Sequence, residues 1–149
     1  DSVREGGNRV ILDTPGKRRK GVEGRVLIAE YDPFHAQLIK DSLERLSINT
    51  KISLNGPEVM QQAAEFHPGV IVSELYLPEL DAFTVKEQLQ ENTKTKDIPF
   101  ILLSHQKNES SVVRAIDLGI IHYIKKPYLL PELLGVINTY VERALRRGA

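Results

Sequence analysis

The chain has 149 residues, of which 41% are hydrophobic and 27% charged, and its formal net charge at pH 7 is zero. This composition suits one soluble domain with a full core, and the neutral balance gives no global attraction to nucleic acid or an anionic membrane. No apolar run approaches the roughly 20 residues that span a bilayer, so we expect no membrane segment. The absence of cysteine excludes disulfides and thiolate metal sites and is compatible with the cytoplasmic location that we expect.

The first 24 residues differ in composition from the rest of the chain. Residues 13–24 read DTPGKRRKGVEG, with one proline, three glycines and a basic run of four residues. Such a composition is typical of a solvated linker. We therefore predict that residues 1–24 lie outside the folded domain, which we place at residues 25–147.

Five short apolar runs follow, and segments with helical periodicity separate them. Nearly continuous apolar runs are typical of strands buried on both faces of a sheet. The runs are Val26–Ala29, a weaker one at Thr50–Leu54, Val70–Val72, Phe100–Leu103 and Ile120–Ile124. Apolar residues recur every three or four positions between Phe34 and Leu46 and again between Leu133 and Leu145. Pro57 and Pro131 stand where first helical turns would begin.

This alternation of strands and helices predicts an α/β fold. Right-handed crossovers leave few topologies, and the one expected is a flavodoxin-like, doubly wound sheet of five parallel strands with five helices. In such sheets the functional site lies at the carboxyl ends of the strands. The segments at those ends are Glu30–Asp32, Glu74–Tyr76, Ser104–His105 and Lys126–Pro127.

Acids, a hydroxyl and an amine therefore come together at one edge of the sheet. Carboxylates can hold a divalent cation or act as nucleophiles, and a hydroxyl and an ammonium can bind phosphoryl oxygens. Each of these residues alone is typical of an ordinary loop, but together they indicate phosphoryl chemistry. The four histidines show no metal-ligand spacing, and His35 is predicted to be a surface residue of its helix.

Four sequence motifs resemble the receiver domains of two-component response regulators, over about Arg25 to Leu145. These motifs are VLIAEYDP (26–33), PGVIVSELYLPELDAF (68–83), IPFILLSH (98–105) and LGIIHYIKKPY (118–128). The resemblance implies a non-enzymatic signal-transduction domain of a phosphorelay-type regulatory protein. It also implies protein partners, namely a histidine kinase or an output domain.

Three positions match the functional pattern that the resemblance implies. Ser104 matches the switch hydroxyl, and Lys126 matches the lysine that contacts the phosphoryl group. Tyr123 matches the aromatic residue that changes rotamer on activation. These matches imply that the switch residues are retained.

The acidic positions depart from the pattern. Glu74 takes the place of the phosphoacceptor aspartate, and the acidic cluster reads Glu30, Tyr31 and Asp32, with Tyr31 where a direct magnesium ligand is usual. Asp32 follows, but successive strand-end residues point in different directions, so we do not expect it to replace that ligand. The longer side chain of Glu74 displaces its carboxylate by roughly 1 Å, which can cost about a hundredfold in rate. We expect weak or absent Mg²⁺ binding, no other cofactor, no catalytic residue and little phosphotransfer.

Several alternatives stay open from the sequence. Glu74 could imitate a phosphorylated acceptor toward Ser104 and Lys126, or it could form a structural ion pair with Lys126. The domain could also be a phosphorylatable receiver that uses Glu74 or Asp81, or a small-ligand sensor that uses the pocket at the strand ends.

Two further expectations concern the surroundings of the domain, and both rest on resemblance. Receivers commonly pair or meet partners through the fourth helix, fifth strand and fifth helix, which correspond to about Ser110–Leu118, His122–Ile124 and Leu130–Leu145. The stretch Arg4–Leu12 (REGGNRVIL) weakly resembles the closing segment of diguanylate cyclase domains, which implies the tail of an upstream domain.

Overall fold

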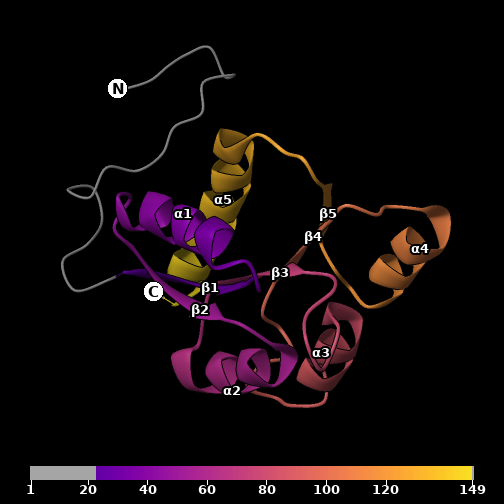
Figure 1. The fold of residues 1–149 in the computed structure, drawn as a ribbon. Coiled ribbons are helices and arrows are strands. Elements are labelled where there is room, and N and C mark those ends of the chain that lie inside the picture. The colour runs from indigo at the N-terminus through magenta and orange to yellow at the C-terminus, as the bar shows by residue number, and fades with distance from the viewer. Residues whose placement is uncertain (1–22, 149) are drawn as a thin grey trace, which may run out of the picture.

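The computed structural model describes residues 23–148. The strands are β1 (Gly24–Ala29), β2 (Ile48–Ser53), β3 (Val70–Glu74), β4 (Phe100–Ser104) and β5 (His122–Lys125). The helices are α1 (Pro33–Glu44), α2 (Gly56–Phe66), α3 (Ala82–Leu89), α4 (Glu109–Asp117) and α5 (Leu130–Gly148). All neighbouring strands pair in parallel, in the order β2-β1-β3-β4-β5. The predicted flavodoxin-like fold is confirmed (Figure 1).

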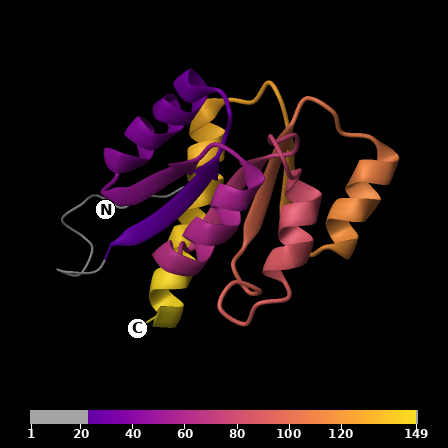
Figure 2. The ribbon, with the colours of Figure 1, turned by 60° about the horizontal axis from the view of Figure 1, so that its bottom comes forward.

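Two hydrophobic cores lie on opposite faces of the sheet. In β1, Leu27 belongs to the core formed with α2, α3 and α4, whereas Val26 belongs to the core formed with α1 and α5. Figure 2 shows α1 and α5 on one side of the strands and α2 and α3 on the other. Burial on both faces explains why the strands are almost continuously apolar in sequence.

The element boundaries depart from the sequence prediction at β2 and β5. β2 begins at Ile48 and not at Thr50, because buried Ile48 pairs with Gly24 at the start of β1. β5 begins at His122 and not at Ile120, because the Ile120 amide donates to the Ala115 carbonyl and so closes the end of α4. Polar and apolar runs cannot reveal such local hydrogen bonds.

The prediction for residues 1–24 falls outside the described residues except at Glu23 and Gly24, and at Gly24 it was wrong, because this residue is buried and begins β1. The predicted tail of an upstream domain lies entirely outside the described residues. Within residues 23–148, no helix combines the length and the apolar character needed to cross a bilayer.

Candidate functional site

The parallel register brings the predicted strand-end residues to one edge of the sheet. Glu74 pairs with Leu103 at the end of β3, and Ser104 pairs with Lys125 at the end of β4. Glu30 follows β1 directly, and Lys126 follows β5. The exposed fractions of Glu30 and Glu74 are only 2% and 4%. Carboxylates so deeply buried need partners, because an unpaired buried charge is costly.

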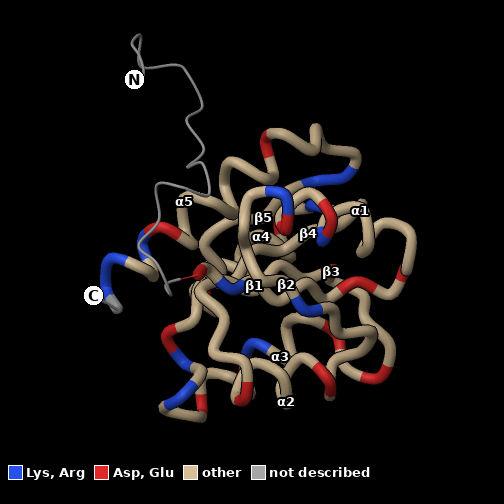
Figure 3. Tube along the Cα trace, turned by 90° about the vertical axis from the view of Figure 1, so that its left-hand side faces the viewer, with Lys and Arg blue, Asp and Glu red and all other residues tan. Residues whose placement is uncertain are grey.

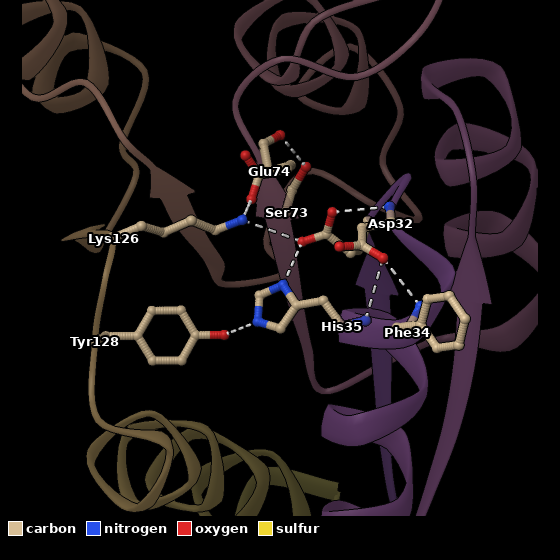
Figure 4. Close-up of polar contacts among 8 residues, drawn as sticks. Asp32, Phe34, His35, Ser73, Glu74, Lys126 and Tyr128 are labelled. Atoms are coloured by element: carbon tan, nitrogen blue, oxygen red, sulfur yellow. Dashed lines mark hydrogen bonds and ion pairs between the residues drawn. The ribbon is translucent and has the colours of Figure 1, made fainter.

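Lys126 is the partner of both buried carboxylates. Its Nζ atom forms an ion pair with Glu74 Oε2, and it lies 3.3 Å from Glu30 Oε1. Figure 4 shows the ends of the Lys126 and Glu74 side chains pointing toward each other. One ammonium group therefore bridges the carboxylates that follow β1 and end β3.

Glu30 has further partners that hold it in place. Its Oε1 atom lies 2.8 Å from His35 Nδ1, and its Oε2 atom accepts a hydrogen bond from the Asp32 amide at 3.1 Å. His35 Nε2 in turn bonds to the hydroxyl of Tyr128, as Figure 4 shows. Oε1 of Glu30 is thus engaged by α1 and by the segment between β5 and α5, and Oε2 by the segment between β1 and α1.

His35 and Tyr128 belong to this network, although neither was predicted from the sequence as a site residue. The His35 side chain is only 23% exposed, so the prediction that it is a surface residue was wrong. Its place in the first turn of α1, five positions after Glu30, was the available signal. No such signal points to Tyr128, which lies 93 positions after His35 in the sequence.

Burial and mutual charge shift the pKa values in the site. Burial raises the pKa of Glu74, and the repulsion of Glu30 adds to this, whereas the bond to Lys126 opposes it. Burial alone would lower the pKa of Lys126, but its hydrogen bond to Glu74 and the charges of Glu30 and Glu74 raise it. Burial is the main cause that raises the pKa of Tyr128, and the charges of Glu30 and Glu74 raise it further. We conclude that Lys126 keeps its charge and that the network is centred on its ammonium group.

The other acids near the site have structural contacts. Asp32 caps α1, where its Oδ1 atom accepts from the Phe34 amide at 3.0 Å. Asp81 caps α3 and accepts from the Thr84 amide at 2.9 Å. Tyr31 is 56% exposed. Among the described residues, no group of three or more His, Cys, Asp or Glu is arranged to hold a metal ion.

The residues matched to the switch make a different set of contacts. Ser104 is buried, and its Oγ atom accepts from the Gln106 amide at 3.1 Å. The Tyr123 hydroxyl donates to the Gln106 carbonyl at 2.5 Å and lies 2.9 Å from Ser111 Oγ. Both side chains are therefore tied to the segment between β4 and α4, and no recorded hydrogen bond within residues 23–148 joins Ser104 to Glu74.

Comparison with known proteins identifies the class to which this fold and site belong. The family model for the response regulator receiver domain matches residues 26–138. The chain therefore belongs to the response regulator receiver domain family, whose members act in signal transduction. Receiver domains are generally non-enzymatic, and they interact with histidine kinases and output domains.

Two curated relatives illustrate the range of proteins that this chain resembles. It is 28% identical over 122 residues to the DNA-binding dual master transcriptional regulator RpaA of Synechocystis sp., covering 82% of this chain and 51% of RpaA. It is 27% identical over 116 residues to the polar-differentiation response regulator DivK of Brucella ovis, covering 78% of this chain and 94% of DivK. The chain thus spans about half the length of RpaA and nearly all of DivK.

Solved structures agree with this assignment. The receiver domain of the Francisella response regulator 1452 has a TM-score of 0.74 and 26% identity, with 81% of this chain and 98% of that one covered. The signal receiver domain of a histidine kinase from Syntrophus aciditrophicus has a TM-score of 0.73 and 28% identity, with 80% and 91% covered.

Proposed function

We propose that this chain is an atypical receiver that signals through protein contacts without ordinary phosphorylation at the acceptor position. The observation that carries the proposal is the double ion pair of Lys126 with Glu74 and Glu30. By resemblance, Lys126 is the group that would bind the phosphoryl oxygens. An ammonium that is already held by two buried carboxylates is a poor binding group for an incoming phosphoryl donor.

The contacts of the candidate ligands at the strand ends support the expectation that magnesium binds weakly or not at all. Mg²⁺ prefers a near-ideal octahedron of oxygen ligands. Glu30 accepts bonds through both of its oxygens, and Glu74 is paired with a cation. Asp32 caps a helix, and Tyr31 offers no carboxylate. Binding of the metal would require the network around Glu30 to be rearranged.

The contacts of Ser104 support the hypothesis that Glu74 and Lys126 form a structural ion pair. A mimic of the phosphorylated acceptor would engage the lysine and the switch hydroxyl together. Here Ser104 Oγ accepts a hydrogen bond from the Gln106 amide, whereas Glu74 forms an ion pair with Lys126. We therefore propose that the acid half of the site, Glu30 and Glu74, is held in place by its ion pairs with Lys126. The residues matched to the switch, Ser104 and Tyr123, form separate hydrogen bonds to Gln106.

Protein contacts are the proposed mode of action, and one surface fits them. Val113 and Ile116 of α4 are 51% and 67% exposed, and both belong to the α4–β5–α5 face through which receivers commonly pair. We propose that a partner or a second copy binds this face. Lysine, arginine and acidic residues are interspersed along the chain (Figure 3), which supports a protein partner over nucleic acid or membrane. Residues 25–147 are the proposed receiver unit, preceded by a linker and an upstream domain.

The experiment that tests this function is incubation with a small phosphoryl donor and magnesium, followed by intact mass measurement. We expect no stable phosphoryl adduct on the wild-type chain. An adduct that disappears in the Glu74→Gln variant but persists in Asp81→Asn would contradict the proposal. An adduct lost only in Asp81→Asn would instead assign the chemistry to the acid that caps α3.

A further inference from the structure

A pocket of about 340 Å³ lies at the edge of the sheet opposite the Glu74 site. Its walls come from α3, the segment before β4, the segment before β5 and the last turns of α5. Figure 2 shows the carboxyl end of α5 and the loop between α3 and β4 at the same end of the molecule. No residue of the phosphorylation-type site lines this pocket, so it is a separate feature of the fold.

The charged residues that line the pocket are mostly cationic. Its titratable lining comprises one aspartate, one tyrosine and four cations, namely Asp97, Tyr140, Lys86, Lys96, Arg143 and Arg147. The formal net charge of the whole chain is zero, so this concentration of positive charge is local. A concave site lined by one sign of charge raises the local concentration of ligands of the opposite sign.

Lys86 is the most unusual of these cations. The residue is only 4% exposed, and within residues 23–148 its ammonium forms no hydrogen bond or ion pair. Its Nζ atom lies 6.0 Å from the ring centre of Phe100. Burial lowers the pKa of Lys86, and the charge of Asp97 opposes this only in part. A partly desolvated ammonium with so little compensation is costly, and an anion in the pocket would offset that cost.

The remaining walls favour an organic ligand over a simple ion. The Arg143 guanidinium lies 5.0 Å from the ring centre of Tyr140, which orients both groups. Ile98, Pro99 and Ile121 add apolar surface. The volume is at the lower end of the range for small-molecule sites and exceeds what one phosphate ion needs.

We propose that this pocket binds a small organic phosphate. A phosphoryl group carries a charge of about −1.5 to −2 at pH 7 and three acceptor oxygens, which suits several convergent cations. Arg143 can bind it through two parallel hydrogen bonds, and Lys86 can bind it as a point charge. The apolar wall and the Tyr140 ring then contact the organic part. This inference is independent of the proposed function, because it uses none of the strand-end residues.

The test is a titration of the full chain with AMP, inorganic phosphate and citrate at constant ionic strength, followed by backbone amide shifts. We expect AMP to cause saturable shifts at Lys86, Gly119 and Ile121, and to bind more tightly than inorganic phosphate or citrate. Lys86→Met keeps the aliphatic stem and removes the charge, and Arg143→Gln removes the planar cation. Each should weaken AMP binding roughly ten- to hundredfold, as expected for loss of a charge-assisted hydrogen bond.

Lys94→Met is the matched control. Lys94 is an exposed cation in the segment between α3 and β4, which forms one wall of the pocket, but it does not itself line the pocket. This substitution should change the affinity less than about twofold, because an exposed charge is screened by solvent. The proposal is overturned if AMP gives no saturable shifts at the pocket amides, or if Lys94→Met weakens binding as much as Lys86→Met. Tighter binding of citrate than of AMP would overturn the assignment to a phosphate and indicate a polycarboxylate. Should Lys86→Met not fold, the Arg143→Gln variant at the pocket rim decides between these outcomes.

Discussion

The two halves of the strand-end site have the same place in the fold but different chemistry. In the half formed by β1 and β3, Glu30 and Glu74 are buried and paired with Lys126. In the half formed by β4 and β5, Ser104 and Tyr123 bond to the segment around Gln106. The first half is held by charge and the second by ordinary hydrogen bonds. We propose that in this receiver the positions matched to the switch are kept, while the acceptor position takes a structural ion pair.

Removal of Lys126 should have the largest effect on the charged half. The Lys126→Met variant leaves Glu30 and Glu74 buried together without their cation, which we expect to lower the free energy of unfolding by roughly 3 kcal/mol. This is the lower end of the range for a buried pair, because the Lys126 side chain is 12% exposed. Urea denaturation measures the change. Lys125→Met, at the exposed neighbouring position, should stay within about 0.5 kcal/mol, and equal losses in the two variants would contradict the pairing.

A smaller effect should appear in the pH dependence of stability. The raised pKa of Glu74 means that the folded state binds this proton more tightly than the unfolded state. Its contribution to stability is therefore present below the ordinary glutamate pKa and is lost as the pH rises through the raised value. Glu74→Gln lacks this contribution, so stability should fall more steeply with pH in the wild type than in the variant.

Thermal unfolding of both proteins from about pH 4 to about pH 8 provides the comparison. The difference between the two curves reports the ionisation of Glu74 together with its coupling to neighbouring groups such as Lys126. Parallel curves would show that Glu74 ionises as freely in the folded chain as in the unfolded one. That result would contradict the description of a desolvated carboxylate.

The smallest effect is expected in the switch half. Tyr123→Phe removes the hydroxyl that bonds to the Gln106 carbonyl and should cost about 1 kcal/mol. Tyr76→Phe is the matched control, since Tyr76 is exposed and its hydroxyl bonds to the Gln106 side chain, and it should cost less. Neither variant should shift the side-chain resonances of Glu74 or Lys126. Shifts there in Tyr123→Phe would show that the two halves are coupled.

The residues at the strand ends could be predicted from the sequence because parallel strands all end at the same edge of the sheet. Apolar runs locate the strands, and the residue that follows each run must lie at the shared carboxyl edge. Glu30, Glu74, Ser104 and Lys126 are found there for this reason. The expectation that Asp32 does not replace the magnesium ligand at the position of Tyr31 stays a prediction, and in the structure Asp32 caps α1.

The sequence did not predict features that depend on contacts between distant segments. The bond between His35 and Tyr128 joins residues 93 positions apart, and no periodicity encodes it. Similarly, the burial of Lys86 follows from how α3 packs beside the start of β4, whereas a lysine in a helical sequence suggests an exposed residue. Tertiary packing decides these cases, so only a structure reveals them.

The most direct test of the locked acid half is a titration of labelled protein with magnesium and then with beryllofluoride. The amides of Glu74, Ser104 and Lys126 are the reporters. The ion-paired site predicts spectra that do not change at these positions as either ligand is added. Saturable shifts that begin at Glu74 and extend to Tyr123 would contradict it, because they would show that the site still binds a phosphoryl analogue and transmits the change to the switch.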